Sequence, residues 1–440
     1  MSFRRLVAAL AFAPLLFVLA CGEEAGGSGG GDNEGGDGQG AGGVGGQGTG
    51  NTSKPTCLTE PSGSSTPDAR ADTAGAFSPD GLSVVLFGGD TATVVCGDMP
   101  AREHVGDTWV LDVACGGWTE VASSGPPARA RHTMATDAAR GRALLFGGRT
   151  RTGSSTSYDL FNDIWAFDFA SQTWSEIVPA NAGPTARSNT ASIVVGDVLY
   201  VFGGSTSTSG TVFNPQDDLW ALDLVTNTWT ELGTSGPRPP ARLFHGMAGD
   251  AAAGQLYVVS GGDENAFIGP FLEDLWTFDL ASGTWSESTV SIDAVEDFGR
   301  IKPALLAQPV EGGARLHYFA GHDAGQLGNR NDTNVLDVGA TAWRASKPGD
   351  TFNKPGSGTC NFPPDFTTID NTSPERRSAF AAAVHPNGQA MVIFGGDTDC
   401  GRASDAWWYD ATAESWEVVR ATPVGLSCLR FSSSCSGLCG

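Results

Sequence analysis

Short apolar runs separated by turn-forming residues make up most of the chain after residue 55. In one stretch, four runs of five to seven residues occupy positions 189–195, 198–202, 219–223 and 228–232. They are rich in Val, Ile, Leu and aromatic residues and are bounded by Gly, Asp and Pro, a pattern typical of β-strands. No stretch of about 10–12 residues has a helical period. We label the four predicted strands of such a unit A, B, C and D, and we expect an all-β fold.

The unit occurs six times. Each copy carries a Leu-Phe-Gly-Gly motif or a variant of it after strand B, with its last glycine at position 89, 148, 204, 262, 321 or 396. The paired glycines are Gly88, Gly89, Gly147, Gly148, Gly203, Gly204, Gly261, Gly262, Gly395 and Gly396. An Asp-x-Trp-x-x-Asp motif follows on strand C, and another Trp stands six residues beyond its second Asp. These positions hold Trp109, Trp118, Trp165, Trp174, Trp220, Trp229, Trp276, Trp285, Trp343, Trp407 and Trp416; in the fifth copy Asn334 replaces the strand C Trp.

The repeated residues have physical roles in a stack of sheets. A glycine pair lets strand B run close to a narrow axis, where a Cβ atom would clash. Two large Trp side chains fill the space between neighbouring sheets. The second Asp of the strand C motif can accept hydrogen bonds from backbone amides two residues on, which forms a tight turn. A four-stranded antiparallel sheet repeated at this period predicts a six-bladed β-propeller.

The same residues resemble the kelch-repeat family, whose pattern adds a Pro-x-Arg element before the next unit. That element occurs here as Pro127-Ala128-Arg129 and Pro240-Ala241-Arg242 and, with one extra residue, as Pro184-Thr185-Ala186-Arg187. The resemblance covers residues 70–420 and implies a kelch propeller, which we place at residues 56–425. The chain departs from the pattern at Ser260 and Ala320 in the glycine motifs, and residues 289–300 lack the Pro-Pro-x-Arg sequence.

The N-terminus resembles a bacterial lipoprotein signal. Arg4 and Arg5 precede a mostly apolar run from Leu6 to Ala20, and a small apolar box ends at Cys21. We expect residues 1–20 to be a signal peptide and Cys21 to be lipidated, so that the protein is exported and anchored to the bacterial envelope, at the outer membrane or cell surface. An ordinary secretory signal is the alternative. Residues 21–55 are Gly-rich, and we expect a disordered linker there.

The net charge of the chain limits the classes of partner that we expect. The chain has 49 acidic and 26 basic residues and a net charge of −23. This balance argues against nucleic-acid binding, because such binding depends on neutralising phosphates with Lys and Arg. We therefore expect contact with a membrane only through the lipid on Cys21.

Eight cysteines remain beside Cys21, an even number that suits disulfides in an oxidising compartment. We predict the bridges Cys360–Cys400 and Cys57–Cys96, because each would join two connections on one face of a blade. Cys115 falls in a C–D turn on the other face, and we expect it in neither bridge. The pairing of Cys115 with the cysteines of the C-terminal tail at residues 426–440 is left open; these are Cys428, Cys435 and Cys439.

Connection lengths differ between the two faces of such a propeller. The A–B and C–D turns are short, whereas the B–C connections between the second Gly and the next Asp hold 17, 14, 13, 11, 10 and 8 residues. The D–A connection from Arg344 to Arg376 has 33 residues. Long connections are usually functional or disordered. We therefore expect the face formed by the B–C and D–A connections to bind the ligand.

An arginine precedes strand A in every copy. The six are Arg70, Arg129, Arg187, Arg242, Arg300 and Arg377. In kelch domains that bind acidic peptides, arginines at similar positions contact carboxylates, and the planar guanidinium suits that role. Internal pairing is the alternative, either with the aspartates after the glycine motifs or with the first aspartates of the strand C motifs. The two sets are Asp90, Asp263, Asp323 and Asp397, and Asp107, Asp163, Asp218, Asp274, Asp332 and Asp405.

These features favour a binding module over an enzyme. Related copper oxidases of the galactose oxidase type need two Tyr, a Cys cross-linked to one of them, and two His, whereas four of the five Tyr here have a packing role. The sequence shows no metal-ligand cluster or cofactor-binding motif, and we identify no catalytic residue. We expect a surface-anchored monomer that binds a protein or a glycan. A carbohydrate-active enzyme of the oxidase, sialidase or epimerase type and a structural scaffold of the cell envelope are the alternatives.

Overall fold

The computed structural model describes residues 53–59, 65–92, 103–151, 157–295, 297–323, 328–353, 367–398 and 401–421. The chain divides into two compact units, residues 1–49 and 50–440, and all described residues belong to the second. The predicted signal peptide, Cys21, most of the linker and the C-terminal tail lie outside the described residues. Cys96, Cys360 and Cys400 lie outside them as well, so the predicted Cys360–Cys400 bridge stays a prediction.

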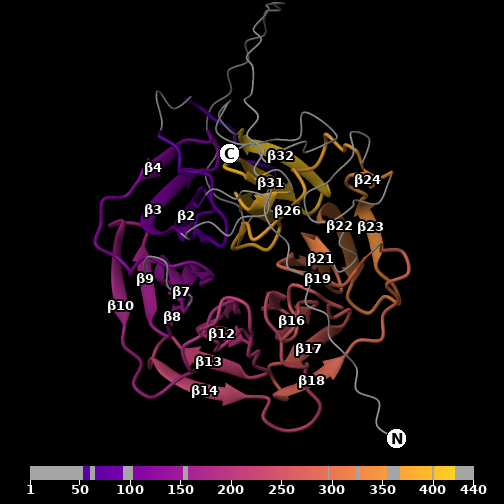
Figure 1. Ribbon diagram of the computed structural model, residues 1–440, viewed down its shortest axis with the longest axis horizontal. Helices are drawn as coiled ribbons and strands as arrows, with labels where there is room; N and C mark the ends of the chain where they lie inside the picture. The colour runs from indigo at the N-terminus through magenta and orange to yellow at the C-terminus, as the bar shows by residue number, and fades with distance from the viewer. Residues whose placement is uncertain are drawn as a thin grey trace, which may run out of the picture. The chain divides into compact units, whose positions relative to one another are not determined.

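Six antiparallel sheets of four or five strands form the body of the described chain (Figure 1). Each takes its A, B, C and D strands from one continuous stretch of chain. The first three sheets consist of β1 (Ala74–Phe77), β2 (Ser83–Asp90), β3 (His104–Asp112) and β4 (Trp118–Glu120); β5 (Thr133–Asp137), β6 (Arg142–Phe146), β9 (Ile164–Asp168) and β10 (Thr173–Ile177); and β11 (Ala191–Val195), β12 (Val198–Phe202), β13 (Leu219–Asp223) and β14 (Thr228–Leu232). The next three consist of β15 (Gly246–Asp250), β16 (Gln255–Val259), β17 (Leu275–Asp279) and β18 (Thr284–Glu287); β20 (Ala304–Val310), β21 (Gly313–Asp323), β22 (Asn329–Asp337) and β23 (Arg344–Lys347), with β19 (Arg300–Ile301) paired to β21; and β27 (Ala381–Val384), β28 (Ala390–Phe394), β31 (Ala406–Asp410) and β32 (Ser415–Arg420).

Shorter strands lie in the connections between these sheets. They are β7 (Arg149–Thr150) with β8 (Asp159–Leu160), β24 (Thr351–Phe352) with β25 (Thr367–Thr368), and β26 (Arg377–Ser378) with β29 (Asp397–Thr398) and β30 (Gly401–Arg402). A single 3₁₀ turn, η1 (Ala138–Arg140), links β5 to β6. Within the described part of the chain, no helix is long and apolar enough to cross a bilayer.

The six sheets follow one another around a central axis, with colours running from indigo β2 to yellow β32 (Figure 1). Their A strands are innermost: β1 contacts β5, β5 contacts β11, β11 contacts β15, β15 contacts β20, and β27 contacts β1. Together they surround a cavity of about 570 Å³ lined mainly by Ala, Gly, Thr and Val residues. The prediction of an all-β propeller is confirmed.

The third sheet shows how closely the apolar runs predict the strands. Strands B, C and D were expected at 198–202, 219–223 and 228–232, which are the bounds of β12, β13 and β14. Strand A begins at Ala191, two residues later than expected. The reason is Asn189, which has a φ of 63° and bonds to the neighbouring sheet instead of continuing the strand.

The glycine pairs act where consecutive sheets meet. Gly88 and Gly89 have φ values of 61° and 107°, a conformation that side-chain-bearing residues rarely adopt. A Cβ on Gly88 would lie 2.6 Å from the carbonyl oxygen of Arg129 in the next sheet. The N–H of Gly89 donates to that same carbonyl at 2.9 Å. Close backbone approach between sheets, together with the positive φ, therefore explains the motif.

The fourth sheet corrects one assignment. Arg300 is the arginine that precedes strand A of the next sheet. The N–H that donates to its carbonyl oxygen belongs to Gly261 and not to Gly262. Ser260, with a φ of 58°, therefore holds the first position of the pair, and Gly262 holds the position of Asp90, bridged to Leu243 as Asp90 is to Ala71. The sequence motif was read one residue too late because two glycines follow Ser260.

The strand D Trp packs across each junction between sheets. Five of them place their ring 4.4–5.8 Å from a Phe on strand B of the preceding sheet; the pairs are Trp118–Phe394, Trp174–Phe87, Trp229–Phe146, Trp285–Phe202 and Trp416–Phe319. Trp343 packs into a cluster with Tyr257 and Val259 of the fourth sheet. Because Trp118 contacts Phe394, the first sheet meets the sixth with the same contact that joins four of the other five pairs of neighbouring sheets.

Candidate functional site

The six arginines before strand A are buried and paired inside the protein. Each is at most 1% exposed. Each guanidinium makes two hydrogen bonds of 2.6–2.9 Å to one carboxylate; the pairs are Arg70–Asp107, Arg129–Asp163, Arg187–Asp218, Arg242–Asp274, Arg300–Asp332 and Arg377–Asp405. Nη1 also donates to the carbonyl at the first position of the glycine pair.

The pairing shifts the carboxylates toward the charged form. Burial alone would raise the pKa values of Asp107, Asp218, Asp332 and Asp405, but the hydrogen bonds and charge of the paired arginine lower each below its usual value. The structure thus places the six arginines in the internal pairs that were one of the two alternatives. They tie strand A to strand C within a sheet and present no guanidinium to the surface.

Six further residues form a ring around the propeller axis. Each stands two positions after one of these arginines. Its members are Asp72, Arg131, Asn189, Phe244, Lys302 and Ala379, all with φ between 54° and 63°. The backbone N–H of each of the next four members donates to the carbonyl oxygen of the member before it. The bonds run from Arg131 to Asp72, from Asn189 to Arg131, from Phe244 to Asn189 and from Lys302 to Phe244. Asp72 N–H donates to Ala379. We call this ring the collar. The collar was not predicted from the sequence, although its constant offset from the arginines could have revealed it.

Charged side chains of the collar lie together. Asp72 Oδ2 accepts from Arg131 Nε at 2.7 Å, and Asp72 Oδ1 accepts from Lys302 Nζ at 2.8 Å. Burial would raise the pKa of Asp72, but these two cations hold it well below its usual value. Burial lowers the pKa of Lys302. Nη1 of Arg131 is buried and has no hydrogen-bond partner among the described residues.

Aromatic rings from two B–C connections cover these charges. Phe213 and Phe267 place their ring centroids 5.9 and 5.7 Å from Phe244 and 5.1 Å from each other. The guanidinium of Arg131 lies 5.2 Å from the Phe244 ring and Lys302 Nζ lies 5.0 Å from it, distances suited to cation–π attraction. We call Asp72, Arg131, Lys302 and the three Phe the axial cluster. Its rim is exposed at Phe267 (47%).

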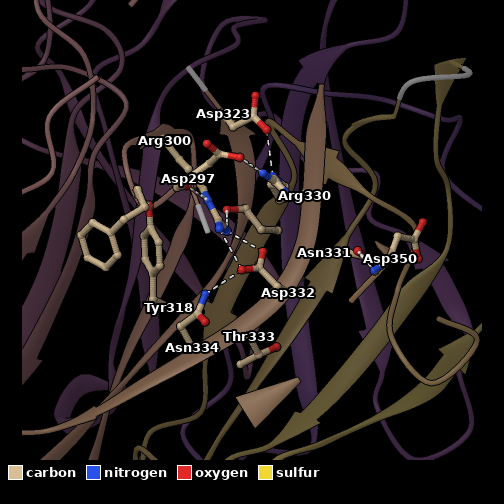
Figure 2. Close-up of polar contacts among 12 residues, drawn as sticks. Asp297, Arg300, Tyr318, Asp323, Arg330, Asn331, Asp332, Thr333, Asn334 and Asp350 are labelled. Carbon is tan, nitrogen blue, oxygen red and sulfur yellow. Dashed lines mark hydrogen bonds and ion pairs between the residues drawn. The ribbon is translucent and has the colours of Figure 1, made fainter. Parts of the chain in front are cut away.

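The fifth sheet carries a further polar network near the same face (Figure 2). Arg330 bonds to Asp323 at 2.8 Å and also to Asp297. Asn331 donates to Asp350 at 3.1 Å. Asn334, in place of the expected Trp, donates through Nδ2 to Asp332 at 2.7 Å. A cavity of about 200 Å³ lies beside Asn334.

One predicted disulfide is wrong. Cys57 bonds to Cys115, with the two Cα atoms 4.7 Å apart, and therefore cannot bond to Cys96. The prediction placed Cys57 on the face of the B–C and D–A connections. The chain before the first sheet instead lies against the C–D turn, where Lys54 Nζ donates to the carbonyl of Ala114. This path of the chain brings Cys57 next to Cys115.

Two of the histidines and Tyr158 have packing roles in the structure. Burial lowers the pKa values of His132 and His245 to about 3, so both imidazoles are neutral, and each packs against a Phe of the preceding sheet. Tyr158 is buried with the guanidinium of Arg149 3.8 Å above its ring. Among the described residues, no three His, Cys, Asp or Glu side chains gather as a metal site would need.

Comparison with known proteins gives consistent results. The family described as KLHDC2/KLHL20/DRC7 Kelch-repeats domain matches residues 76–300. The N-(sulfonatooxy)prop-2-enimidothioate sulfolyase of Thlaspi arvense is 30% identical over 64% of this chain and 75% of its own length. The leucine-zipper-like transcriptional regulator 1 homolog of Drosophila melanogaster is 23% identical over 66% of this chain, and an F-box/kelch-repeat protein of Arabidopsis thaliana is 29% identical over 36%. The match spans 26% and 37% of the lengths of these last two relatives.

A solved structure shares the fold. The structure of YjhT superposes with a TM-score of 0.56 at 14% sequence identity, covering 80% of this chain and 98% of that one. At this identity the likeness concerns the path of the backbone alone.

Proposed function

The chain belongs to the kelch-repeat family of β-propellers, and from that premise we propose that it is a protein-interaction module that binds its partner through the face of the B–C and D–A connections. The kelch fold supports the general role. The axial cluster supports the choice of face, because it gathers three aromatic rings, two cations and a buried donor at the centre of that face. Aromatic residues, Phe included, and Arg are enriched at the cores of protein interfaces.

Exposed apolar side chains extend the axial cluster outward. Ile268 (72% exposed) and Val212 (65%) follow and precede Phe267 and Phe213 in the chain. Isolated exposed apolar residues are common on protein surfaces, but here they stand on two neighbouring connections whose rings touch. A partner that covers them would bury apolar area around a cationic centre. That surface fits a protein segment with an acidic group flanked by apolar residues.

The remaining parts of the proposal concern assembly and location. We propose that the six sheets are all the blades of one propeller, which acts as a monomer, and that lipidated Cys21 anchors it to the envelope. Replacing Cys21 with Ala should release the protein from the membrane fraction, because one lipidated residue would supply its whole membrane affinity. Unchanged fractionation would contradict the anchor and leave the binding face untouched.

The binding face is tested with two matched surface variants. Phe267→Ser with Ile268→Ser removes the exposed rim of the axial cluster, whereas Val225→Ser removes an equally exposed apolar side chain (69%) from a C–D turn on the other face. Tagged wild-type protein and both variants are used to capture proteins from detergent-solubilised envelopes. We expect the captured protein to be lost with the double variant and kept with Val225→Ser. Retention by both, or capture of a glycan alone, would refute the proposal.

A further inference from the structure

The junction between the sixth and the first sheet differs from the other five in its chain connection. Each of the others is crossed by a D–A connection, which runs from strand D of one sheet to strand A of the next. Here strand D is β32, which ends at Arg420, and strand A is β1, which begins at Ala74. Within the described part of the chain, no strand before β1 pairs with the sixth sheet. The described contacts that close the ring at this junction are therefore noncovalent.

Hydrogen bonds join the inner edges of the two sheets. The N–H of Gly396 donates to the carbonyl oxygen of Arg70 at 2.8 Å. Nη1 of Arg402 donates to the carbonyl oxygen of Asp90 at 2.6 Å and to its carboxylate at 3.0 Å. The first sheet thus supplies its acceptors from the start of strand A and the end of strand B.

An apolar cluster fills the rest of the junction. It unites Phe77, Leu86 and Trp109 of the first sheet with residues of the sixth such as Phe394. The members that it takes from the first sheet and its C–D turn all lie between residues 57 and 115, with Trp118 as the one exception. The first sheet's side of the junction is therefore built almost entirely from one segment of the chain.

The disulfide Cys57–Cys115 encloses that segment. The two cysteines are 58 residues apart in the sequence, and the loop that they close contains β1, β2 and β3. A disulfide limits the conformations that its loop can reach when unfolded, so it disfavours local unfolding of the strands inside the loop. Local unfolding of β1–β3 would remove one side of the junction and open the ring. The disulfide thus opposes opening at the junction that no D–A connection crosses.

The disulfide also lies next to the sixth sheet. Lys54 Nζ, three residues before Cys57, is 3.3 Å from the Glu417 carboxylate on β32. A Cβ on Gly116 would lie 2.2 Å from the carbonyl oxygen of Val419, whereas Gly283, at the equivalent place in the fourth sheet, meets nothing within 4 Å. The C–D turn that carries Cys115 therefore packs directly against the outer strand of the sixth sheet.

We propose that Cys57–Cys115 is a redox-sensitive latch that keeps the ring closed. Both cysteines are partly exposed, so a dithiol can reach the bond. One thiolate of the dithiol attacks a sulfur atom and the S–S bond breaks; the second thiolate then closes the dithiol's own disulfide. Two electrons pass to Cys57 and Cys115, and each sulfur takes up a proton. β1–β3 then unfold locally more often, and the ring opens at the first sheet.

Opening also disturbs the axial cluster. Asp72 belongs to the first sheet, whereas its partners Arg131 and Lys302 belong to the chain that leads into the second and fifth sheets. Reduction therefore withdraws the carboxylate that holds the two cations together. This consequence for a bound partner rests on the proposed function, but the latch itself does not.

Hydrogen exchange followed by mass spectrometry tests the latch on the full chain without any partner. Wild type is compared with the double variant Cys57→Ser/Cys115→Ser, which removes this bond alone. We expect amides of β1–β3 to exchange at least about tenfold faster in the double variant, with β11–β14 of the third sheet unchanged. Equal exchange in β1–β3, or an acceleration of the same size in the third sheet, would overturn the inference.

Two controls separate the disulfide from its surroundings. Lys54→Met removes the ion pair with Glu417 and keeps the disulfide, so exchange in β1–β3 should stay within about twofold of wild type, because exposed ion pairs contribute little. Dithiothreitol, a dithiol, should accelerate β1–β3 in wild type and have no further effect there in the double variant. Acceleration by Lys54→Met as large as that of the double variant, or an equal response of both proteins to dithiothreitol, would refute the latch. Loss of the partner with an unchanged exchange pattern would leave the proposed function standing and the latch refuted.

Discussion

Replacing Asp218 with Ala should destabilise the propeller strongly, although Asp218 belongs to no apolar core. Its carboxylate accepts from Arg187 Nη1 at 2.6 Å, from Arg187 Nη2 at 2.9 Å and from Trp220 Nε1 at 2.7 Å. The Arg187 side chain is only 2% exposed. Removing one partner of such a pair leaves a buried charge uncompensated, which costs about 3–5 kcal/mol.

The structure places the expected loss near the lower end of that range. Arg187 keeps its bonds to the carbonyl oxygens of Gly203 and Thr185 and to the hydroxyl of Thr185. Asp218 is 19% exposed, so water can reach the space that Ala leaves. We therefore expect a loss of about 3 kcal/mol in the free energy of unfolding.

Urea denaturation of wild type, Asp218→Ala, Arg187→Met and the double variant Arg187→Met/Asp218→Ala measures the pair. Urea is uncharged and does not screen the ion pair. The double variant should be more stable than the sum of its single losses predicts by at least about 1 kcal/mol, because it leaves neither charge unpaired. A loss below about 1 kcal/mol for Asp218→Ala, or strict additivity in the cycle, would show that Arg187 is solvated and the reasoning wrong.

Three more predictions concern packing, the disulfide and acid stability. Trp229→Ala should cost about 3–5 kcal/mol in urea denaturation, because Trp229 is 3% exposed and packs on Phe146 of the preceding sheet; a cost below about 1 kcal/mol would contradict that contact. Cys115→Ser should lower stability by about 2–4 kcal/mol under oxidising conditions only, and non-reducing peptide mapping should recover Cys57 joined to Cys115; Cys57 joined to another cysteine would refute it. His132 and His245 have pKa values of about 3 in the folded protein, below the value near 6.5 expected in the unfolded chain. The unfolded chain therefore binds more protons between these two pH values. The free energy of unfolding should fall as the pH drops from about 6.5 to about 3. Replacing His132 with Phe should flatten the pH dependence of the urea midpoint in that window, and an unchanged slope would count against a neutral buried imidazole.

Much of the fold is visible in the sequence because each repeat is a local unit. The apolar runs of the third copy predict β12, β13 and β14, and the positions of Trp and Gly predict which residues meet a neighbouring sheet. The strand D Trp residues lie where expected because successive side chains of a strand point to opposite faces, so the position of Trp229 in the strand fixes which neighbouring sheet it meets. The loss of Trp at Asn334 is likewise visible in the sequence, although its consequence is not.

The face that we propose to bind the partner was only partly predictable. The lengths of the B–C connections pointed to it, but the residues at its centre come from six positions that are far apart in the chain and differ in type. In the sequence, Asp72, Arg131 and Lys302 share only their offset of two residues from the arginine that precedes strand A. Their side chains form ion pairs because the hydrogen bonds of the collar bring the sheets together. The aromatic cover from Phe213 and Phe267 depends on the path of two connections that follow no repeat.

The sequence alone determined that this protein is a repeated all-β structure with an arginine and an aspartate at fixed places in each unit. The tertiary structure decided which of them pair and that the paired arginines are buried. It also decided that Cys57 meets Cys115. The physical reason is the same throughout: strand formation depends on neighbours along the chain, whereas charge pairing, disulfides and cavities depend on residues that only the closed arrangement of sheets brings within a few ångströms.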